Sequence, residues 1–129
     1  MLKKIVVTGG EGRFSKELKK INSKYKFIFR NKKQFNILSL KSIEKNLKKF
    51  KPDAVLHLAG LSRPMSLHNK NIIKSIDLNI IGTANLVKVC SKKKLKLFLF
   101  QLAMCIQVLW ETIKRVILYF LGIIMDGQN

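Results

Sequence analysis

Short apolar runs alternate with amphipathic stretches along the first 98 residues of the chain. The runs are rich in β-branched and aromatic residues, which is typical of strands buried on both faces of a parallel sheet. The stretches between them carry apolar residues at helical spacing. In chain order, the predicted strands are KKIVVTG (3–9), KFIFR (26–30), DAVLHLAG (53–60) and KLKLFLF (94–100), and the predicted helices are SKELKKI (15–21), SLKSIEKNLKKF (39–50) and residues 68–91.

This alternation predicts an α/β fold, an incomplete Rossmann-type doubly wound parallel sheet with helices on both faces. The pattern contains no internal repeat, and the connections are short. The apolar positions that mark the longer helices are Leu40, Ile43, Leu47 and Phe50 in the first, and Ile72, Ile76, Ile80 and Leu86 or Val87 in the second.

The composition changes near Phe98. Residues 1–98 contain 21 of the 22 lysines, whereas residues 99–129 contain one, Lys114. The uncharged runs of this apolar tail, residues 97–110 and 116–125, are separated by ETIKR, and each is shorter than the about 20 residues that a membrane-spanning helix needs. One transmembrane helix is therefore not expected, while an interfacial helix in contact with a membrane stays open.

Charge and cysteine usage narrow the classes of function. The formal net charge is +19, but the lysines occur singly and in pairs, without an arginine-rich block or interleaved aromatic residues for base stacking. A specific nucleic-acid partner is therefore not expected. Cys90 and Cys105 have no metal-ligand or disulfide-framework spacing, and the apolar stretch before the first glycines is too short for a secretory signal. We expect no metal site and a reducing, cytoplasmic location.

The candidate chemistry lies in the first turn, VTGGEGRFSKEL. Gly10, Gly12 and Ser15 occupy the GxGxxG/A spacing between a predicted strand and a predicted helix. Glycines allow a tight turn and a close approach of the backbone to a pyrophosphate, which rests on the N-terminus of the helix. The spacing predicts a dinucleotide site, and an ordinary glycine-rich turn is the alternative.

Arg30 ends the second predicted strand, about 20 residues past the first glycine, where a fold that prefers NAD places an acidic residue for the ribose 2′-hydroxyl. A guanidinium suits a 2′-phosphate instead. Arg30 is followed by Asn31, Lys32 and Lys33. We therefore expect NADP in preference to NAD, although a basic residue at this position in so lysine-rich a chain also arises by chance.

Three segments resemble the extended short-chain dehydrogenase/reductase family of NAD(P)-dependent sugar-nucleotide epimerases, dehydratases and reductases, with the dTDP-4-dehydrorhamnose reductases as near relatives. The segments are VTGGEGRFSKEL, KPDAVLHLAG and DLNIIGTANLVKVC, and the likeness covers residues 1 to about 98. This resemblance implies a cofactor site whose pyrophosphate is lined by Gly9, Gly10, Gly12, Arg13 and Phe14.

The same resemblance implies further contacts around the cofactor. Ile37, after a short third strand, would lie near the adenine. Leu58, Ala59 and Gly60 would border the nicotinamide, and Asn79 would support the active site. His57 and His68 receive no catalytic role.

The resemblance also implies a catalytic tyrosine and lysine in the pattern YxxxK, which this chain lacks. Four residues after Tyr119 stands Ile123, and four residues after Tyr25 stands Phe29. We therefore assign no catalytic residue in this chain. Residues 1–98 are expected to form the N-terminal part of a dinucleotide-binding domain, and residues 99–129 a tail outside the family pattern.

The codons that the tail permits suggest why its composition differs. The tail can be translated back into the codons that each residue permits. The third base of each codon is then joined to the first two bases of the next codon, starting with the last base of the Phe100 codon. In this shifted frame, permitted codons can spell STSYVYPGTMGNYKKSDPLLPWNNYGWSK. This alternate reading contains a serine region, and its YGWSK satisfies YxxxK. Many third bases are free choices, but the valine of SYVYP is forced by Met104 followed by Cys105. The glycine of YGWSK is likewise forced by Met125 followed by Asp126.

We therefore predict a one-base frameshift near the codons for Lys92 to Phe98. The expected function is that of a truncated NAD(P)-binding half of a sugar-nucleotide oxidoreductase or epimerase, without catalysis as it stands. A non-enzymatic nucleotide-binding or membrane-associated module with a genuine apolar tail is the alternative. Which sugar nucleotide the intact relative uses, and whether it reduces, epimerises or dehydrates, stay open.

Overall fold

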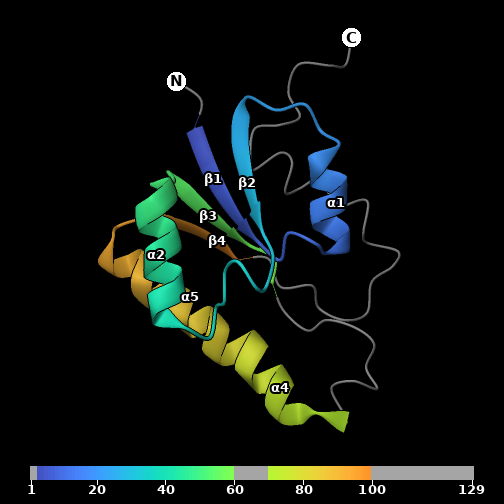
Figure 1. Ribbon diagram of the computed structural model, residues 1–129, viewed down its shortest axis with the longest axis vertical. Coiled ribbons are helices and arrows are strands. Elements are labelled where there is room, and N and C mark those ends of the chain that lie inside the picture. The colour runs from blue at the N-terminus through green and yellow to red at the C-terminus, as the bar shows by residue number, and fades with distance from the viewer. Residues whose placement is uncertain (1–2, 60–69, 100–129) are drawn as a thin grey trace.

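Residues 3–59 and 70–99 are described by the computed structural model of the chain, and they form a parallel sheet covered by helices (Figure 1). The sheet comprises β1 (Lys3–Thr8), β2 (Tyr25–Arg30), β3 (Ala54–His57) and β4 (Lys96–Leu99). Within the described residues their order is β2-β1-β3-β4, and every neighbouring pair is parallel. Because β1 has β2 on one side and β3 on the other, the chain winds away from β1 in both directions. The predicted Rossmann-type doubly wound sheet is confirmed.

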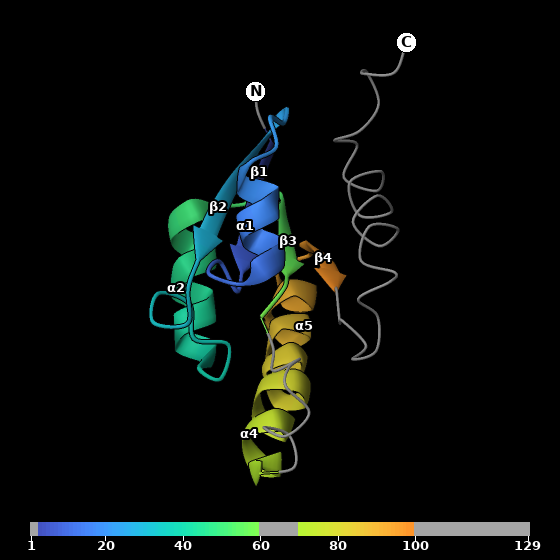
Figure 2. The same cartoon turned by 90° about the vertical axis from the view of Figure 1, so that its right-hand side faces the viewer.

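Helices cover both faces of this sheet, as Figure 1 shows. Helix α1 (Arg13–Lys19) lies on one face, and α2 (Leu40–Phe50) and α5 (Gly82–Lys92) lie on the other. A short helix, α4 (Ile72–Ile76), continues through one π-helical turn, η1 (Asp77–Ile81), into α5. In Figure 2 this continuous helical rod extends beyond the end of the sheet.

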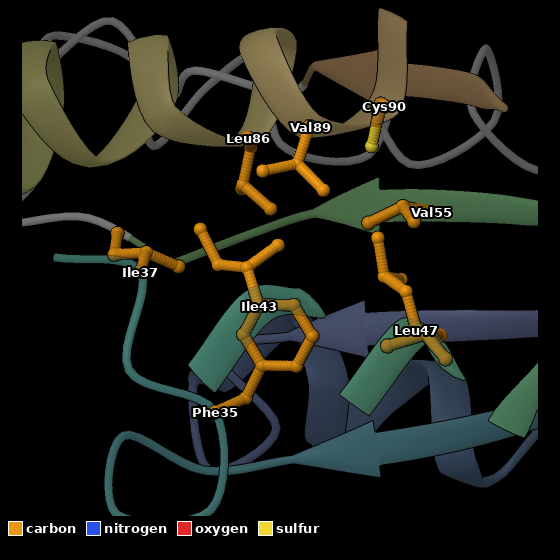
Figure 3. Close-up of a cluster of buried hydrophobic side chains, with 9 residues drawn as sticks. Phe35, Ile37, Ile43, Leu47, Val55, Leu86, Val89 and Cys90 are labelled. Carbon is orange, nitrogen blue, oxygen red and sulfur yellow. The ribbon is translucent and has the colours of Figure 1, made fainter. Parts of the chain in front are cut away.

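The apolar run of β1 is continuous because both of its faces are buried. Val6 faces α2 and α5, while Ile5 and Val7 face α1. On the α2 and α5 side, Ile43 and Leu47 point toward the α5 residues across Val55 (Figure 3). The buried members of this larger cluster are Val6, Phe35, Ile37, Ile43, Leu47, Val55, Leu86, Val89 and Cys90.

The smaller cluster joins α1 to the opposite face. Phe14 and Leu18 are four residues apart on α1 and are 5% and 1% exposed. This spacing places both side chains on the face of the helix that meets the sheet. Their packing holds the N-terminal end of α1 close to the carboxyl end of β1.

Local signals set the limits of α2. The Ser39 hydroxyl accepts a hydrogen bond from the Ser42 amide at 3.3 Å, as a helix N-cap does. The helix ends at Phe50, and its C-cap Lys51 has a left-handed φ of 45° and is followed by Pro52. Asp53 then pairs with Lys4 through two hydrogen bonds of 2.8 Å, which aligns the start of β3 with β1.

One expectation needs correction. No strand precedes Ile37, because residues 31–39 form turns in the described structure. The predicted helix 68–91 is present from Ile72 onward as α4, η1 and α5, but only the part of its apolar stripe that lies over the sheet enters the core. Ile72, Ile76 and Ile80 are 65%, 42% and 61% exposed, because this part of the helix extends past the sheet. Leu86, which lies over the sheet, is fully buried.

The sequence left membrane contact open only through the apolar tail. Nearly all of this tail, residues 100–129, lies outside the described residues. In the part of the chain that the structure describes, none of the helices has the length and apolar character needed to cross a bilayer.

Gly82 opens α5 where the helix passes closest to Ile37. A Cβ at Gly82 would lie 2.5 Å from Ile37 Cδ1 and 2.7 Å from its Cγ1. Ile37 is 4% exposed and therefore has little room to move aside. A side chain at residue 82 would therefore force the buried Ile37 side chain to move, which favours glycine although glycine weakens the helix.

We expect Gly82→Ala to lower the free energy of unfolding. Overpacking a filled core costs about 1–3 kcal/mol, which outweighs the about 1 kcal/mol that alanine contributes to helix stability. In an Ile37→Val background, which lacks Cδ1, the penalty should shrink. Urea unfolding of the four chains in this double-mutant cycle measures the coupling, and a coupling energy below about 0.5 kcal/mol would contradict the packing argument.

Candidate functional site

The carboxyl ends of the strands form one row at one edge of the sheet. Arg30 pairs in register with Thr8, Thr8 with His57, and His57 with Leu99. In doubly wound sheets, ligands bind beyond this edge where the strand order reverses, which here is the end of β1. The turn from β1 to α1 is therefore the centre of the candidate site.

Gly9 makes the first turn possible. Its φ is +70°, and its carbonyl accepts hydrogen bonds from the Gly12 amide at 2.9 Å and from Ser15 Oγ at 2.8 Å. A Cβ at Gly9 would lie 2.8 Å from the backbone nitrogen of Ala59. The missing side chain thus lets the loop after β3 lie directly against the glycine-rich turn.

Gly10 fixes the other side of the turn. Its amide donates to the Arg30 carbonyl at 2.9 Å, and a Cβ there would lie 2.9 Å from the Arg30 nitrogen. Lys19 Nζ donates to the Gly10 carbonyl at 2.9 Å while lying 4.9 Å from the ring centroid of Phe29. No sequence signal pointed to Lys19, because one lysine among 22 has no distinguishing pattern. The turn is held between the end of β2 and the loop after β3.

The remaining residues of the turn differ in exposure. Gly12 is the N-cap of α1 without a side-chain cap, and Arg13 in the first turn is exposed. The Phe14 side chain is buried between α1 and the sheet, so Phe14 can line a pyrophosphate only with its backbone.

Arg30 lies on the α2 face of the sheet. Its guanidinium carbon stacks 5.0 Å from the ring centroid of Phe50, and its Nε is buried without a hydrogen-bond partner among the described residues. The next turn is closed by reciprocal bonds between Asn31 and Gln34 at 3.1 and 3.0 Å. Asn31 Nδ2 also donates to Glu11 Oε1 at 3.1 Å, which ties this turn to the glycine-rich turn.

The loop after β3 is anchored by a buried polar cluster. His57 is 4% exposed, with Nδ1 2.8 Å from Thr8 Oγ1 and Nε2 3.0 Å from Thr83 Oγ1. The amides of Leu58 and Ala59 each donate to Thr8 Oγ1 at 3.2 Å. Burial lowers the pKa of His57 to about 4, so the ring is neutral at neutral pH. Sequence reasoning missed this cluster because its members are far apart in the chain and match no motif.

The other residues implied by the family resemblance have these positions. Leu58 and Ala59 follow β3 beside Gly9, and Gly60 lies outside the described residues. Ile37 has its side chain in the larger core cluster, and its carbonyl accepts from Asn85 Nδ2 at 3.0 Å. Asn79 lies in η1, where its Nδ2 donates to Ser75 Oγ at 3.3 Å. The structure brings Gly9, Gly10, Leu58 and Ala59 together and leaves Asn79 on the helical rod.

Other parts of the described structure offer no competing chemistry. Residues 3–59 and 70–99 contain no cluster of histidine, cysteine and acidic side chains that could hold a metal ion. Cys90 is a free thiol in the core, and burial raises its pKa. A hollow of about 540 Å³ is lined by residues of α2, of α5 and of the C-cap of α5, without any from the strand ends: Lys41, Glu44, Lys45, Lys48, Val89, Lys92 and Lys93.

The NAD dependent epimerase/dehydratase family matches residues 5–106 of the chain. This match extends past the change of composition at Phe98, and residues 107–129 lie outside it. None of the curated proteins compared with the chain matches it.

Solved structures share the fold. The dTDP-4-dehydrorhamnose reductase of Bacillus anthracis str. Ames, in complex with NADP, is 19% identical with a TM-score of 0.67 over 75% of this chain and 35% of its own. The UDP-glucose 4-epimerase of Thermus thermophilus, in complex with NAD, is 16% identical with a TM-score of 0.62 over 73% and 36%. The L-threonine dehydrogenase of Clostridium difficile is 21% identical with a TM-score of 0.65 over 75% and 35%. The chain thus spans about a third of the length of these structures.

Gly9 and Gly12 should respond differently to alanine. Gly9→Ala forces a left-handed conformation that costs a β-carbon about 1–2 kcal/mol, and it adds a clash with the Ala59 backbone. Gly12 has φ −69° and ψ 164°, which alanine adopts readily. We expect Gly9→Ala to lower the free energy of unfolding by more than about 2 kcal/mol and Gly12→Ala by less than about 1 kcal/mol. Equal losses in urea unfolding would show that the Gly9 conformation is not required.

His57 should make the fold sensitive to mild acid. Its pKa is about 4 in the folded chain and near 6.5 when unfolded, so the unfolded state binds more protons between these values. The contribution of neutral His57 to the free energy of unfolding is therefore fully present above pH 6.5. This contribution falls by about 3 kcal/mol as the pH drops to about 4.

Urea unfolding across this pH range measures the loss, and His57→Gln serves as the control. The variant keeps the other titratable groups but removes the histidine, so its stability should change less over the same range. Parallel pH profiles for the two proteins would contradict the assignment.

Proposed function

Because the chain belongs to the NAD dependent epimerase/dehydratase family, we propose that residues 1–98 bind a nicotinamide dinucleotide as the N-terminal part of a sugar-nucleotide oxidoreductase or epimerase. The observation that carries the proposal is the position of the glycine-rich turn. Gly9 lies against Leu58 and Ala59, and Gly10 against Arg30, at the point where the strand order reverses. This arrangement allows a pyrophosphate to approach the backbone.

The residues present supply binding and orientation. Gly9, Gly10 and Gly12 leave room for the pyrophosphate, with the exposed Arg13 beside it. Leu58 and Ala59, held at the end of β3, border the nicotinamide side, with Gly60 next in the chain. The bound cofactor supplies the hydride chemistry. Ile37 and Asn79 are proposed at the adenine and active-site ends respectively.

We further propose NADP as the preferred cofactor, with NAD as the alternative. The Arg30 guanidinium contacts the Phe50 ring, and the N–H groups at its edge can donate to a 2′-phosphate. Hydrogen bonds to charged groups contribute about 1.5–3 kcal/mol. Lys32 and Lys33, exposed on the adjoining turn, add positive charge beside it.

The chain lacks the tyrosine and lysine of YxxxK, so we propose that it binds cofactor without turnover as it stands. The proposed cause is a one-base shift of the reading frame near the codons for Lys92 to Phe98. The boundary between residues 98 and 99 and a cytoplasmic location belong to the same proposal. The buried free thiol of Cys90 supports a reducing compartment.

Cofactor selectivity tests the role of Arg30. We expect NADPH to bind more tightly than NADH, and Arg30→Asp to reduce NADPH affinity at least about tenfold, because a carboxylate repels the 2′-phosphate. Fluorescence titration of both cofactors measures the change. Lys24→Asp is the matched control, since it alters charge equally on an exposed residue before β2. Equal effects of both substitutions would remove Arg30 from the site.

The coding DNA tests the frame. From the codon for Phe100 onward, the overlapping frame should spell a serine-containing strand end and then YxxxK. Restoring it by one base should give a longer protein that binds NADP(H) and turns over a sugar nucleotide. Replacing the restored tyrosine by phenylalanine should then abolish turnover while binding remains.

Stop codons in that frame, or codons incompatible with YxxxK, would mean that the tail is genuine. The non-enzymatic nucleotide-binding or membrane-associated module would then be the better interpretation. Partition of the protein between membrane and soluble fractions would separate this module from the truncated cofactor-binding half.

A further inference from the structure

The neighbours of the Thr8 hydroxyl determine which hydrogen bonds it accepts and which it donates. A hydroxyl has one proton to donate and two lone pairs to accept. Both lone pairs of Thr8 Oγ1 are used by the amides of Leu58 and Ala59 at 3.2 Å. The Thr8 proton is therefore available for His57 Nδ1, which lies 2.8 Å away and is the other hydrogen-bonding neighbour of Oγ1 among the described residues.

This count assigns the histidine tautomer. Nδ1 of His57 accepts from Thr8, so the proton of the neutral ring is on Nε2. Nε2–H then donates to Thr83 Oγ1 at 3.0 Å. The chain of hydrogen bonds runs in one direction, from the loop amides through Thr8 and His57 to the first turn of α5.

We propose that His57 is a positioning residue of the dinucleotide site: as the Nε2–H tautomer it orients the Thr8 hydroxyl, which holds the Leu58 and Ala59 backbone against Gly9. The proposal rests on the proposed cofactor function, because Leu58 and Ala59 border the nicotinamide side there. Thr83 Oγ1 contacts the other ring nitrogen from α5, while the loop amides themselves are bound by Thr8.

The geometry explains why a rigid link is needed here. Gly9 and the Ala59 nitrogen are close enough that a single added carbon would lie 2.8 Å from that nitrogen. A loop that moved away would open this contact and widen the cofactor site. Two partly buried amides bound to one buried hydroxyl keep both residues in place, because each would otherwise lose its partner.

Nitrogen-15 NMR of the full chain tests the tautomer without any ligand. We expect an unprotonated Nδ1 and a protonated Nε2 for His57 at neutral pH, with His57→Gln identifying its signals. Thr83→Val should shift the Nε2 signal and leave the Leu58 and Ala59 amides protected. A proton on Nδ1, or a charged ring at neutral pH, would overturn the proposal.

Hydrogen exchange tests the link to the loop. Thr8→Val removes the hydroxyl while keeping the shape, so exchange at Leu58 and Ala59 should accelerate about tenfold. Thr8→Ser keeps the hydroxyl and should retain protection, while amides of α2 stay unchanged in both variants. Unchanged protection in Thr8→Val would overturn the proposal, since the hydroxyl would then not hold the loop.

NADPH binding separates a positioning role from a merely structural one. Affinity should fall about tenfold in Thr8→Val, return in Thr8→Ser, and fall in His57→Gln. Unchanged affinity in a less stable Thr8→Val would refute positioning. If the unaltered chain and its frame-restored form both fail to bind NADPH, the proposed function fails. Ring signals and amide exchange then still decide whether His57 and Thr8 hold this loop.

Discussion

The contact between Gly9 and the backbone after β3 is the constraint on which the candidate site depends. The strand β1 ends between two neighbours, and its turn must pass both the Arg30 carbonyl and the Ala59 nitrogen. Only a residue without a β-carbon fits against the Ala59 nitrogen. Because β1 is central, this position also fixes where α1 begins, and through Phe14 and Leu18 it fixes how α1 packs on the sheet.

The sequence predicted the elements that depend on local pattern. The continuous apolar run of β1 and the helical spacing of Ile43 and Leu47 correctly indicated a strand buried on both faces and a helix above it. The pattern failed where burial depends on distant elements. Ile76 has the spacing of a core residue but lies on a helix that extends past the sheet, and Ile37 enters the core from a turn.

The features of the candidate site that follow from local sequence were also predictable, whereas those that depend on distant elements were not. Glycine spacing predicted a turn at Gly10 and Gly12, because a turn requires particular residues at fixed separation, and the structure has this turn. The link of Thr8 to His57 and of His57 to Thr83 depends on strand register and on the placement of α5, which no short segment encodes. Arg30 was predicted from its position, and its contact with Phe50 was not, since that aromatic ring comes from the far end of α2.

The strand order has a kinetic consequence. The central strand β1 is synthesised first, but its partners come later: Lys3 pairs with Tyr25, and Ile5 pairs with Ala54. Each pairing closes a long stretch of chain before it gains any hydrogen bonds, and parallel pairing of this kind is slow. On the ribosome, β1 emerges with both edges unsatisfied and waits for β3 before its second edge is covered. The second edge of β1 therefore stays open to association with other chains until the third strand has been made.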